Sequence, residues 1–222
     1  MLNRPVSLAA LKSFHMFRNL SDERLEPVSR CAILRNVARG AIVLHAGDRT
    51  DYIYFVLSGN LKVLVSDEDG REVILTMIGP GEVFGEMGVL DEDVRSATVL
   101  AVSSANLVVM SKCDFKRIML DNAEVALQIT RNLVQRLRQA DRKIESLALL
   151  DVYGRVARLL LDMAEDVGGQ KVVTRKISKQ DIAKMIGASR EMVSRVMKDL
   201  NVHGLIEETD GKVILHEHAA TI

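Results

Sequence analysis

The chain has 222 residues, which allows one large or two modest domains. Hydrophobic residues make up 48% of it, but no apolar run is long enough to cross a bilayer, so no membrane partner is expected. The 30 Lys and Arg residues balance the 30 Asp and Glu residues, so the overall charge does not indicate nucleic acid. The first residues lack the apolar core of a secretion signal, and Cys31 and Cys113 form no CxxC pair, which predicts a cytoplasmic protein with reduced thiols.

The first 34 residues have the pattern of helices. An apolar cluster comes first, made of Leu8, Leu11, Phe14, Met16 and Phe17. Ser21, followed by two acids, is typical of a helix start, and we expect that helix to continue as far as Ile33.

Residues 37–111 have the pattern of a β-rich domain. Short runs of β-forming residues alternate there with turn residues, at positions 41–44, 53–57, 61–66, 73–78, 97–102 and 107–110. Asp69-Gly70, between the third and fourth runs, is a strong hairpin signal. Many short strands separated by turns predict a sandwich or a jelly roll.

Within this region, residues 85–97 have the composition of a ligand-binding loop. Gly85 has no Cβ, which lets the backbone approach a ligand closely. Residues 85–90 are predicted to form one helical turn whose free N–H groups face an anion. This part of the loop therefore suits a phosphate.

Three side chains in the same loop add to this chemistry. Arg95 offers the planar fork that suits a phosphate, and Ser96 offers a further donor. Glu86 can only accept hydrogen bonds, which suits a ribose 2′-hydroxyl. Together they indicate a pocket for a small phosphorylated ribose. The alternative is a polar loop between strands, in which Glu86 and Arg95 pair on the surface.

Residues 114–149 are predicted to form one long helix. Its apolar side steps by four and three residues, through Ala126, Thr130, Leu133, Leu137, Ala140, Ile144 and Leu147. This heptad spacing is typical of a coiled-coil dimer, and the absence of Gly and Pro from the segment favours a dimer. The alternative is an amphipathic helix that packs on its own domain.

Residues 151–167 are predicted to form another helix, which ends at Gly168-Gly169 and leads into a short strand at 171–177. Two capped helices should follow. Ser178 and Ser189 are typical N-caps, and Gly187 between them is typical of a tight turn. This arrangement predicts a helix-turn-helix.

The second of these helices, at residues 190–200, has a polar outward face formed by Arg190, Glu191, Ser194 and Arg195. Arginine can grip the guanine edge, and glutamate can accept from the cytosine amine, which predicts base reading in the major groove. With Val193 and Val196 inward, Met192 is expected to be unavailable for bases. Residues 175–200 carry seven Lys and Arg against three Asp and Glu. The alternative is a surface charge cluster at helical spacing.

Residues 205–208 and 212–215 flank a turn at 209–211, which predicts a hairpin after the helix-turn-helix. Such a hairpin would complete a winged helix.

Two motifs carry a family resemblance that covers nearly the whole chain. Gly85-Glu86, followed by Arg95-Ser96-Ala97, resembles the phosphate-binding cassette of cyclic-nucleotide-binding domains. Residues 177–182 and 187–195 resemble the helix-turn-helix of bacterial transcription regulators of the cyclic-AMP receptor protein/FNR (Crp/Fnr) family.

The resemblance implies an α+β fold of two domains. An N-terminal β jelly roll that binds a cyclic nucleotide would span residues 1–149, including a dimerisation helix at about 114–149. A C-terminal winged helix-turn-helix would span residues 150–222.

The same resemblance implies a homodimer that is no enzyme, binds double-stranded DNA and contacts RNA polymerase. Its half-site would resemble TGTGA, repeated as an inverted palindrome. The implied ligand-binding positions are Gly85, Glu86, Met87, Arg95, Ser96, Ala97, Ala140 and Asp141. The implied DNA-binding positions are Ser178, Lys179, Ser189, Arg190, Glu191, Ser194, Arg195 and Lys198.

One departure concerns the base of the nucleotide. Cyclic-AMP receptors carry adjacent hydroxyl or amide residues that contact adenine, where this chain has Ala140 and Asp141. Ala140 cannot hydrogen-bond, whereas Asp141 can accept from the amine of adenine or guanine. Cyclic AMP is the first expectation for the effector. Cyclic GMP, cyclic di-GMP and ligand independence are the alternatives, and no metal or haem is expected.

A rival of another class is a cyclic-nucleotide-binding module that acts through protein partners. Its C-terminal domain would then contact protein in place of DNA. The outward set of Arg190, Glu191 and Arg195 argues against this alternative.

Overall fold

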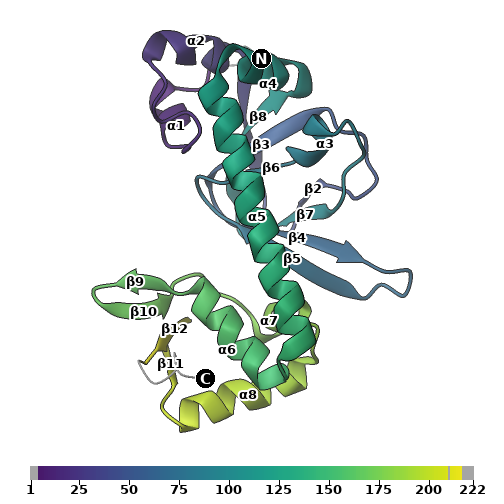
Figure 1. The fold of residues 1–222 in the computed structure, drawn as a ribbon, viewed down its shortest axis with the longest axis vertical. Helices are drawn as coiled ribbons and strands as arrows, with labels where there is room; N and C mark the ends of the chain where they lie inside the picture. The colour runs from purple at the N-terminus through teal and green to yellow at the C-terminus, as the bar shows by residue number, and fades with distance from the viewer. Residues whose placement is uncertain (1–4, 210, 217–222) are drawn as a thin grey trace. The chain divides into compact units, whose positions relative to one another are not determined.

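The computed structural model describes residues 5–209 and 211–216. They form two compact units that divide after Gln135, inside the long helix α5 (Ala123–Leu149) (Figure 1). The predicted α+β organisation, with a β-sheet domain followed by a helix-turn-helix, is confirmed. The domain boundary predicted at residues 149 and 150 stays a prediction, because α5 contributes residues to both units.

The strands of the first unit form two antiparallel four-stranded sheets. One sheet has the order β1 (Ala32–Val37), β8 (Ala105–Ser111), β3 (Tyr52–Ser58) and β6 (Val83–Phe84). The other has the order β2 (Ile42–Leu44), β7 (Thr98–Ala101), β4 (Leu61–Ser66) and β5 (Glu72–Ile78). The hairpin predicted at Asp69-Gly70 joins β4 to β5, which pair in antiparallel register.

Strand β3 lies between two hydrophobic layers, because successive side chains of a strand point to opposite faces. Tyr54 and Val56 pack into the core between the two sheets. Ile53 and Phe55 pack on the other side, against α1 (Leu8–Lys12), α2 (Asp22–Cys31), α4 (Lys112–Asp121) and the start of α5.

Helix α2 ends earlier than its pattern predicts. The expectation that it reaches Ile33 was wrong, because α2 ends at Cys31 and Ile33 pairs with Val109 in the β1–β8 ladder. The exposed middle of β1, which includes Arg35 and Asn36, hides the alternation that marks a strand.

The predicted helix over residues 114–149 is two helices. Asn122, at φ −137° and ψ 93°, ends α4, and α5 begins at the next residue. The Asn122 side-chain amide donates to the Ile118 carbonyl, and the backbone carbonyl of Asn122 accepts from the Val125 amide. Asparagine competes for backbone hydrogen bonds in this way, which explains a break without Gly or Pro.

The second unit contains the rest of α5 and the predicted winged helix-turn-helix. Its helices are α6 (Val152–Met163), α7 (Lys179–Ile186) and α8 (Arg190–Val202). Its antiparallel sheet has the order β11 (Ile206–Thr209), β12 (Lys212–Leu215), β10 (Gln170–Val173) and β9 (Glu165–Val167). Within residues 5–209 and 211–216, no helix has both the length and the hydrophobicity needed to cross a membrane.

Gly168 and Gly169 have another role than the predicted one. Helix α6 ends at Met163, and the two glycines form the turn between β9 and β10, with φ values of 63° and 84°. Glycine adopts such positive φ angles without strain, so the pair suits a hairpin as well as a helix end.

Phe55 is the side chain on which the helical side of the first unit depends. Its ring centroid lies 5.4 Å from that of Phe14, 5.3 Å from Phe17 and 6.2 Å from Phe115. We expect Phe55→Ala to lower the free energy of unfolding by about 3–5 kcal/mol, because it leaves a cavity among buried rings. Urea unfolding of the first unit, followed by circular dichroism, measures this change.

The control is Leu120→Ala, which truncates a side chain that is 87% exposed. It should change the free energy of unfolding by less than about 0.5 kcal/mol. Equal effects of the two substitutions would contradict the role given to Phe55.

Candidate functional site

The loop predicted to bind a ligand begins with a turn that only glycine fits. Gly85 follows β6 and has φ +78°, and Met87–Leu90 then form the short helix α3. A Cβ on Gly85 would lie 2.6 Å from Nη1 of Arg95. Both the backbone angle and this close approach require glycine at position 85.

Glu86 and Arg95 are buried, with exposed fractions of 0% and 5%. Nη1 of Arg95 donates to the Gly85 carbonyl at 2.8 Å, and Nη2 donates to the Tyr52 carbonyl at 2.5 Å. Nε of Arg95 is buried and has no hydrogen-bond partner among the described residues. Because both residues are buried, the alternative of a Glu86–Arg95 pair on the surface was wrong.

The charge of Arg95 is held in a balance of opposing effects. The pKa of its guanidinium is lowered, because burial outweighs the opposing effects of Tyr54, Asp51 and Glu86. The guanidinium carbon also lies 5.9 Å from the centroid of the Tyr54 ring, and that ring stacks on Phe84 at 5.0 Å. The net effect of the surroundings thus disfavours the buried cation, and a further anionic group would favour it.

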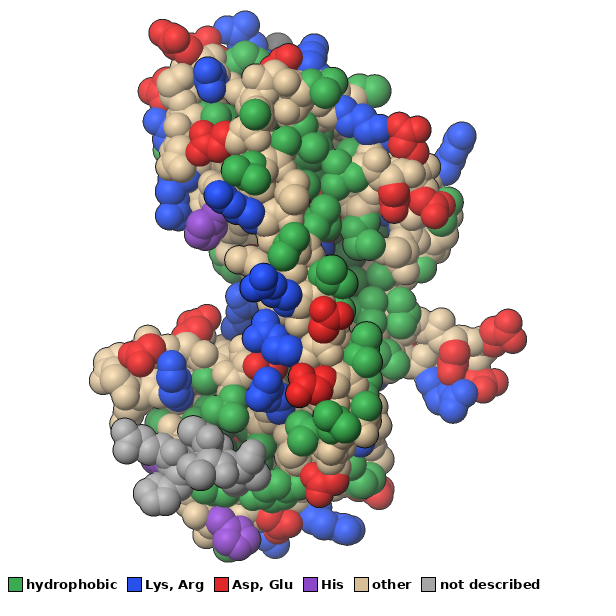
Figure 2. Space-filling model, in the orientation of Figure 1, with side chains coloured by type: hydrophobic (Ala, Val, Ile, Leu, Met, Phe, Trp, Pro, Cys, Tyr) green, Lys and Arg blue, Asp and Glu red, His purple; other side chains and the backbone are tan. Residues whose placement is uncertain are grey.

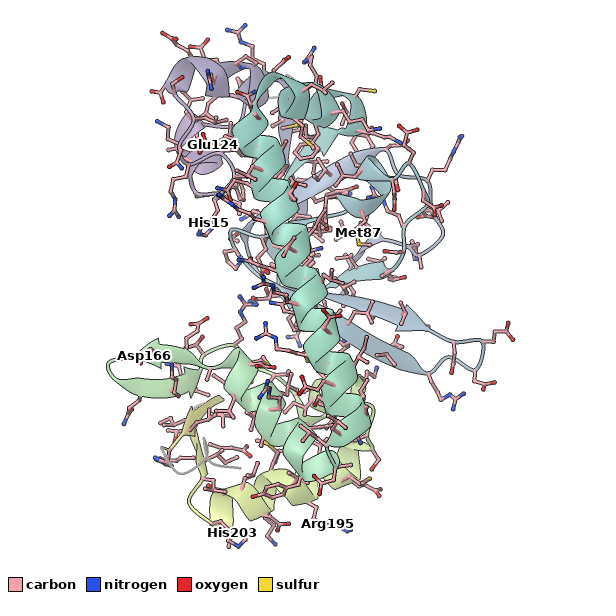
Figure 3. All side chains as sticks on the ribbon, in the orientation of Figure 1. His15, Met87, Glu124, Asp166, Arg195 and His203 are labelled. Carbon is pink, nitrogen blue, oxygen red and sulfur yellow. The ribbon has the colours of Figure 1, made fainter. Side chains whose placement is uncertain are left out.

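The other predicted residues of the loop lie around this pair. Ser96 is exposed, Met87 is 48% exposed and Ala97 is buried. Figure 3 shows Met87 on the first unit, at the short helix α3. The structure therefore brings together all six predicted residues of the loop, with two charged groups inside and Ser96 and Met87 at the surface.

Sequence reasoning missed two residues at this site, one inside the loop and one outside it. A Cβ on Gly88 would lie 2.3 Å from Oγ1 of Thr50, so Gly88 is needed for α3 to pack on the segment just before β3. Thr50 is itself buried, and within the described residues its hydroxyl has no hydrogen-bond partner. The second glycine of Gly-Glu-Met-Gly was the only signal for this contact.

The tip of the loop is tied to α4. Glu92 is the one described non-glycine residue with positive φ, at 65°, and its carboxylate pairs with the Lys116 ammonium. The hydrogen bond from Lys116 is the largest cause that lowers the pKa of Glu92.

Ala140 and Asp141 belong to the second unit, where both are exposed on α5. Six large apolar residues of α5 are exposed, namely Leu127, Val134, Leu137, Ile144, Leu147 and Leu149, at 49%, 44%, 62%, 65%, 54% and 76%. Figure 2 shows hydrophobic side chains exposed along this helix. Of the predicted seam residues, Leu133 packs against the first unit's core, whereas Leu127 and Val134, which the prediction did not include, are exposed. The seam itself stays a prediction.

The helix-turn-helix has the predicted caps. The Ser178 hydroxyl accepts from the Asp181 amide at 3.0 Å, and the Ser189 hydroxyl accepts from the Met192 amide at 3.1 Å. Gly187 takes the left-handed turn between the helices at φ 66°. The two serines therefore act first as helix caps.

The predicted DNA-binding side chains differ in exposure. Arg190, Glu191, Arg195 and Lys198 are exposed and Ser194 is half-buried, while Val193, Met197 and Leu200 face the core. Figure 3 shows Arg195 projecting from α8, away from the rest of the second unit. Lys179 lies 3.5 Å from the Glu208 carboxylate, which joins α7 to the wing.

One expectation for α8 was wrong. Met192 was expected to be unavailable because its neighbours point inward, but its side chain is 45% exposed. Helical geometry places it about 60° around the axis from Arg195, outside the buried sector of Val193 and Met197.

The sequence matches two known families. Residues 34–122 match the cyclic nucleotide-binding domain, and residues 154–220 match the Crp-like helix-turn-helix domain. These two matches contain the buried Glu86–Arg95 loop and helices α7 and α8, respectively.

Characterised proteins match over most of the chain. The cAMP-activated global transcriptional regulator CRP of Pasteurella multocida is 35% identical, over 85% of this chain and 91% of its own length. The regulator Vfr of Pseudomonas aeruginosa, also named as cAMP-activated, is 35% identical over 81% and 86%.

Solved structures agree in fold. The structure of the c-di-GMP responsive global regulator CLP of Xanthomonas campestris has a TM-score of 0.73 and 28% identity, and the match covers 88% of this chain and 99% of CLP. Proteins of this kind are transcription regulators and not enzymes. The chain therefore belongs to the Crp/Fnr family of DNA-binding transcription regulators.

Proposed function

We propose that the protein is a homodimeric transcription regulator whose sequence-specific DNA binding is controlled by cyclic AMP. The observation that carries this proposal is the buried pair of Glu86 and Arg95 at the Gly85 turn. Two relatives named as cAMP-activated support cyclic AMP as the effector. The c-di-GMP responsive regulator CLP makes cyclic di-GMP the first alternative, and cyclic GMP is the second.

The phosphate would bind to Arg95. A guanidinium has five N–H donors, and two of its nitrogens are engaged by the backbone carbonyls of Gly85 and Tyr52. Nε is buried without a hydrogen-bond partner among the described residues, whereas buried donors are normally bonded. An anionic oxygen would satisfy this donor and compensate the charge, and the exposed Ser96 hydroxyl would add a further bond.

The ribose and the base would each donate a hydrogen bond to a carboxylate of the protein. Glu86 lies beside Arg95, where its carboxylate would accept from the ribose 2′-hydroxyl. Asp141 is exposed on α5 and would accept from the amine of the base, while Ala140 beside it offers no hydrogen bond. Adenine and guanine both carry such an amine, so this half of the site leaves the cyclic GMP and cyclic di-GMP alternatives open.

The dimer would form through α5. The exposed residues Leu127, Val134, Leu137 and Ile144 recur at spacings of seven, three and seven, which is a coiled-coil pattern. Pairing of two copies would place the two α8 helices about 34 Å apart, one turn of DNA. The target would be an inverted repeat of TGTGA-like half-sites. The dimer would bind it in the cytoplasm and would contact RNA polymerase there.

Substitution of Arg95 tests the effector site. We expect Arg95→Ala to raise the Kd for cyclic AMP at least about 100-fold, because hydrogen bonds to a charged group contribute about 1.5–3 kcal/mol each. Arg71→Ala, at a side chain that is 78% exposed, should leave this Kd unchanged. Isothermal titration calorimetry measures the Kd for cyclic AMP of the unaltered protein and of both variants.

Arg95 also holds two backbone carbonyls, so its loss could disturb the loop itself. Ser96→Ala leaves that network intact and should still raise the Kd about tenfold, for one lost hydrogen bond to a charged phosphate. If folded Arg95→Ala and Ser96→Ala proteins bound cyclic AMP as the unaltered protein does, the assignment of the site would be wrong.

Substitution of Arg190 separates DNA binding from the protein-partner alternative. Arg190→Ala should weaken binding to the specific inverted repeat about 10- to 100-fold and affect random DNA far less, because a base contact contributes about 1–3 kcal/mol. Arg158→Ala, a half-exposed arginine of α6, is the matched control. Fluorescence anisotropy at fixed salt measures both. Unchanged specific binding by Arg190→Ala would favour a module that acts through protein partners.

A further inference from the structure

The exposed face of α8 includes an apolar residue as well as polar ones. Helical geometry places successive residues about 100° apart, so Glu191 and Arg195 lie at the centre of this face. Ser194 lies on one flank and Met192 on the other. Met192 is 45% exposed, which puts a large apolar side chain next to the two charged residues expected to read bases.

Met192 is not part of the hydrophobic core of the second unit. The hydrophobic core contains Val193 and Met197, and Ala188 and Val196 pack against it from partly buried positions. Met192 is absent from that cluster, although it is only one turn before Val196. A single exposed apolar side chain is common on protein surfaces, so its placement on α8 is the informative observation.

The placement is that of a base-reading side chain. Met192 is the third residue of α8, and its amide is fixed by the Ser189 cap at 3.1 Å. The first residues of a recognition helix are the ones that reach base edges. A thioether offers only a weak hydrogen-bond acceptor, so it would not discriminate among the polar groups of the groove.

The apolar group that base pairs present in the major groove is the C5-methyl of thymine. Resting on the proposed DNA-binding function, we propose that Met192 determines specificity by packing on a thymine methyl beside the bases read by Glu191 and Arg195. The unbranched, polarisable side chain can adjust to a methyl at that edge. Met192 would therefore discriminate thymine from cytosine at one position of each half-site.

The test removes the methyl group and the side chain separately. The DNA is the best inverted repeat recovered by selection from random sequences, with each thymine replaced in turn by deoxyuridine in both half-sites. At one position, this replacement should weaken binding about fourfold per half-site, equivalent to about 0.8 kcal/mol for one buried methyl-sized group. Fluorescence anisotropy of the full-length protein measures the Kd values.

The same DNA series is then measured with Met192→Ala. The ratio of the Kd for deoxyuridine DNA to the Kd for thymine DNA at that position should fall to near one. The ratios at the other positions should stay unchanged. Val202→Ala is the matched control, because Val202 is an exposed apolar residue, at 73%, near the other end of α8. It should keep the full penalty.

Two failures can be told apart. If the protein selects no DNA sequence at all, the proposed DNA-binding function fails. If it binds a selected sequence but Met192→Ala shows the same deoxyuridine penalties as the unaltered protein, only the role of Met192 is overturned. A folded Met192→Gln protein, which keeps the length of the side chain, distinguishes loss of apolar contact from loss of helix structure.

Discussion

The buried guanidinium of Arg95 is the constraint on which the ligand loop depends. A buried charge costs several kcal/mol unless it is paired and hydrogen-bonded, so the surrounding chain must supply partners. The carbonyls of Gly85 and Tyr52 do so, and Glu86 adds a nearby negative charge. This arrangement requires glycine at position 85, since a Cβ would meet the guanidinium itself. A cyclic phosphate would therefore enter a loop whose cation is already in place, so little ordering would oppose its binding.

Helix α5 is the second constraint, because one continuous element contributes to both compact units. Its start is fixed by Val125 and Ile129 in the first core, and its exposed apolar row continues past Gln135 through Leu137 and Ile144. An effector can shift a regulator only by binding one of its states more tightly than another. A residue of α5 that contacts the base, as proposed for Asp141, would give the nucleotide such a preference.

Much of this fold and site could be predicted where local signals agreed. Strand runs bounded by turns, the Ser178 and Ser189 caps and the Gly187 turn all indicated the observed elements. The errors came where one pattern fits two structures. Arg35 and Asn36 hid a strand, Asn122 ended a helix without Gly or Pro, and Gly168-Gly169 suited a hairpin as well as a helix end. Burial of Glu86 and Arg95, the Thr50–Gly88 contact and the exposure of Met192 depend on packing between segments, which spacing along the chain does not reveal.

In the proposed switch, a nucleotide bound at Arg95 strengthens DNA binding. Isothermal titration of the purified protein with cyclic AMP, cyclic GMP and cyclic di-GMP, each with and without the inverted-repeat DNA, tests it most directly. We expect cyclic AMP to bind and DNA to tighten its binding about 5- to 150-fold, because coupling between two sites is reciprocal. If none of the three nucleotides binds while the DNA does, control by a cyclic nucleotide is contradicted. Binding of cyclic GMP or cyclic di-GMP alone would keep the pocket and overturn the choice of effector.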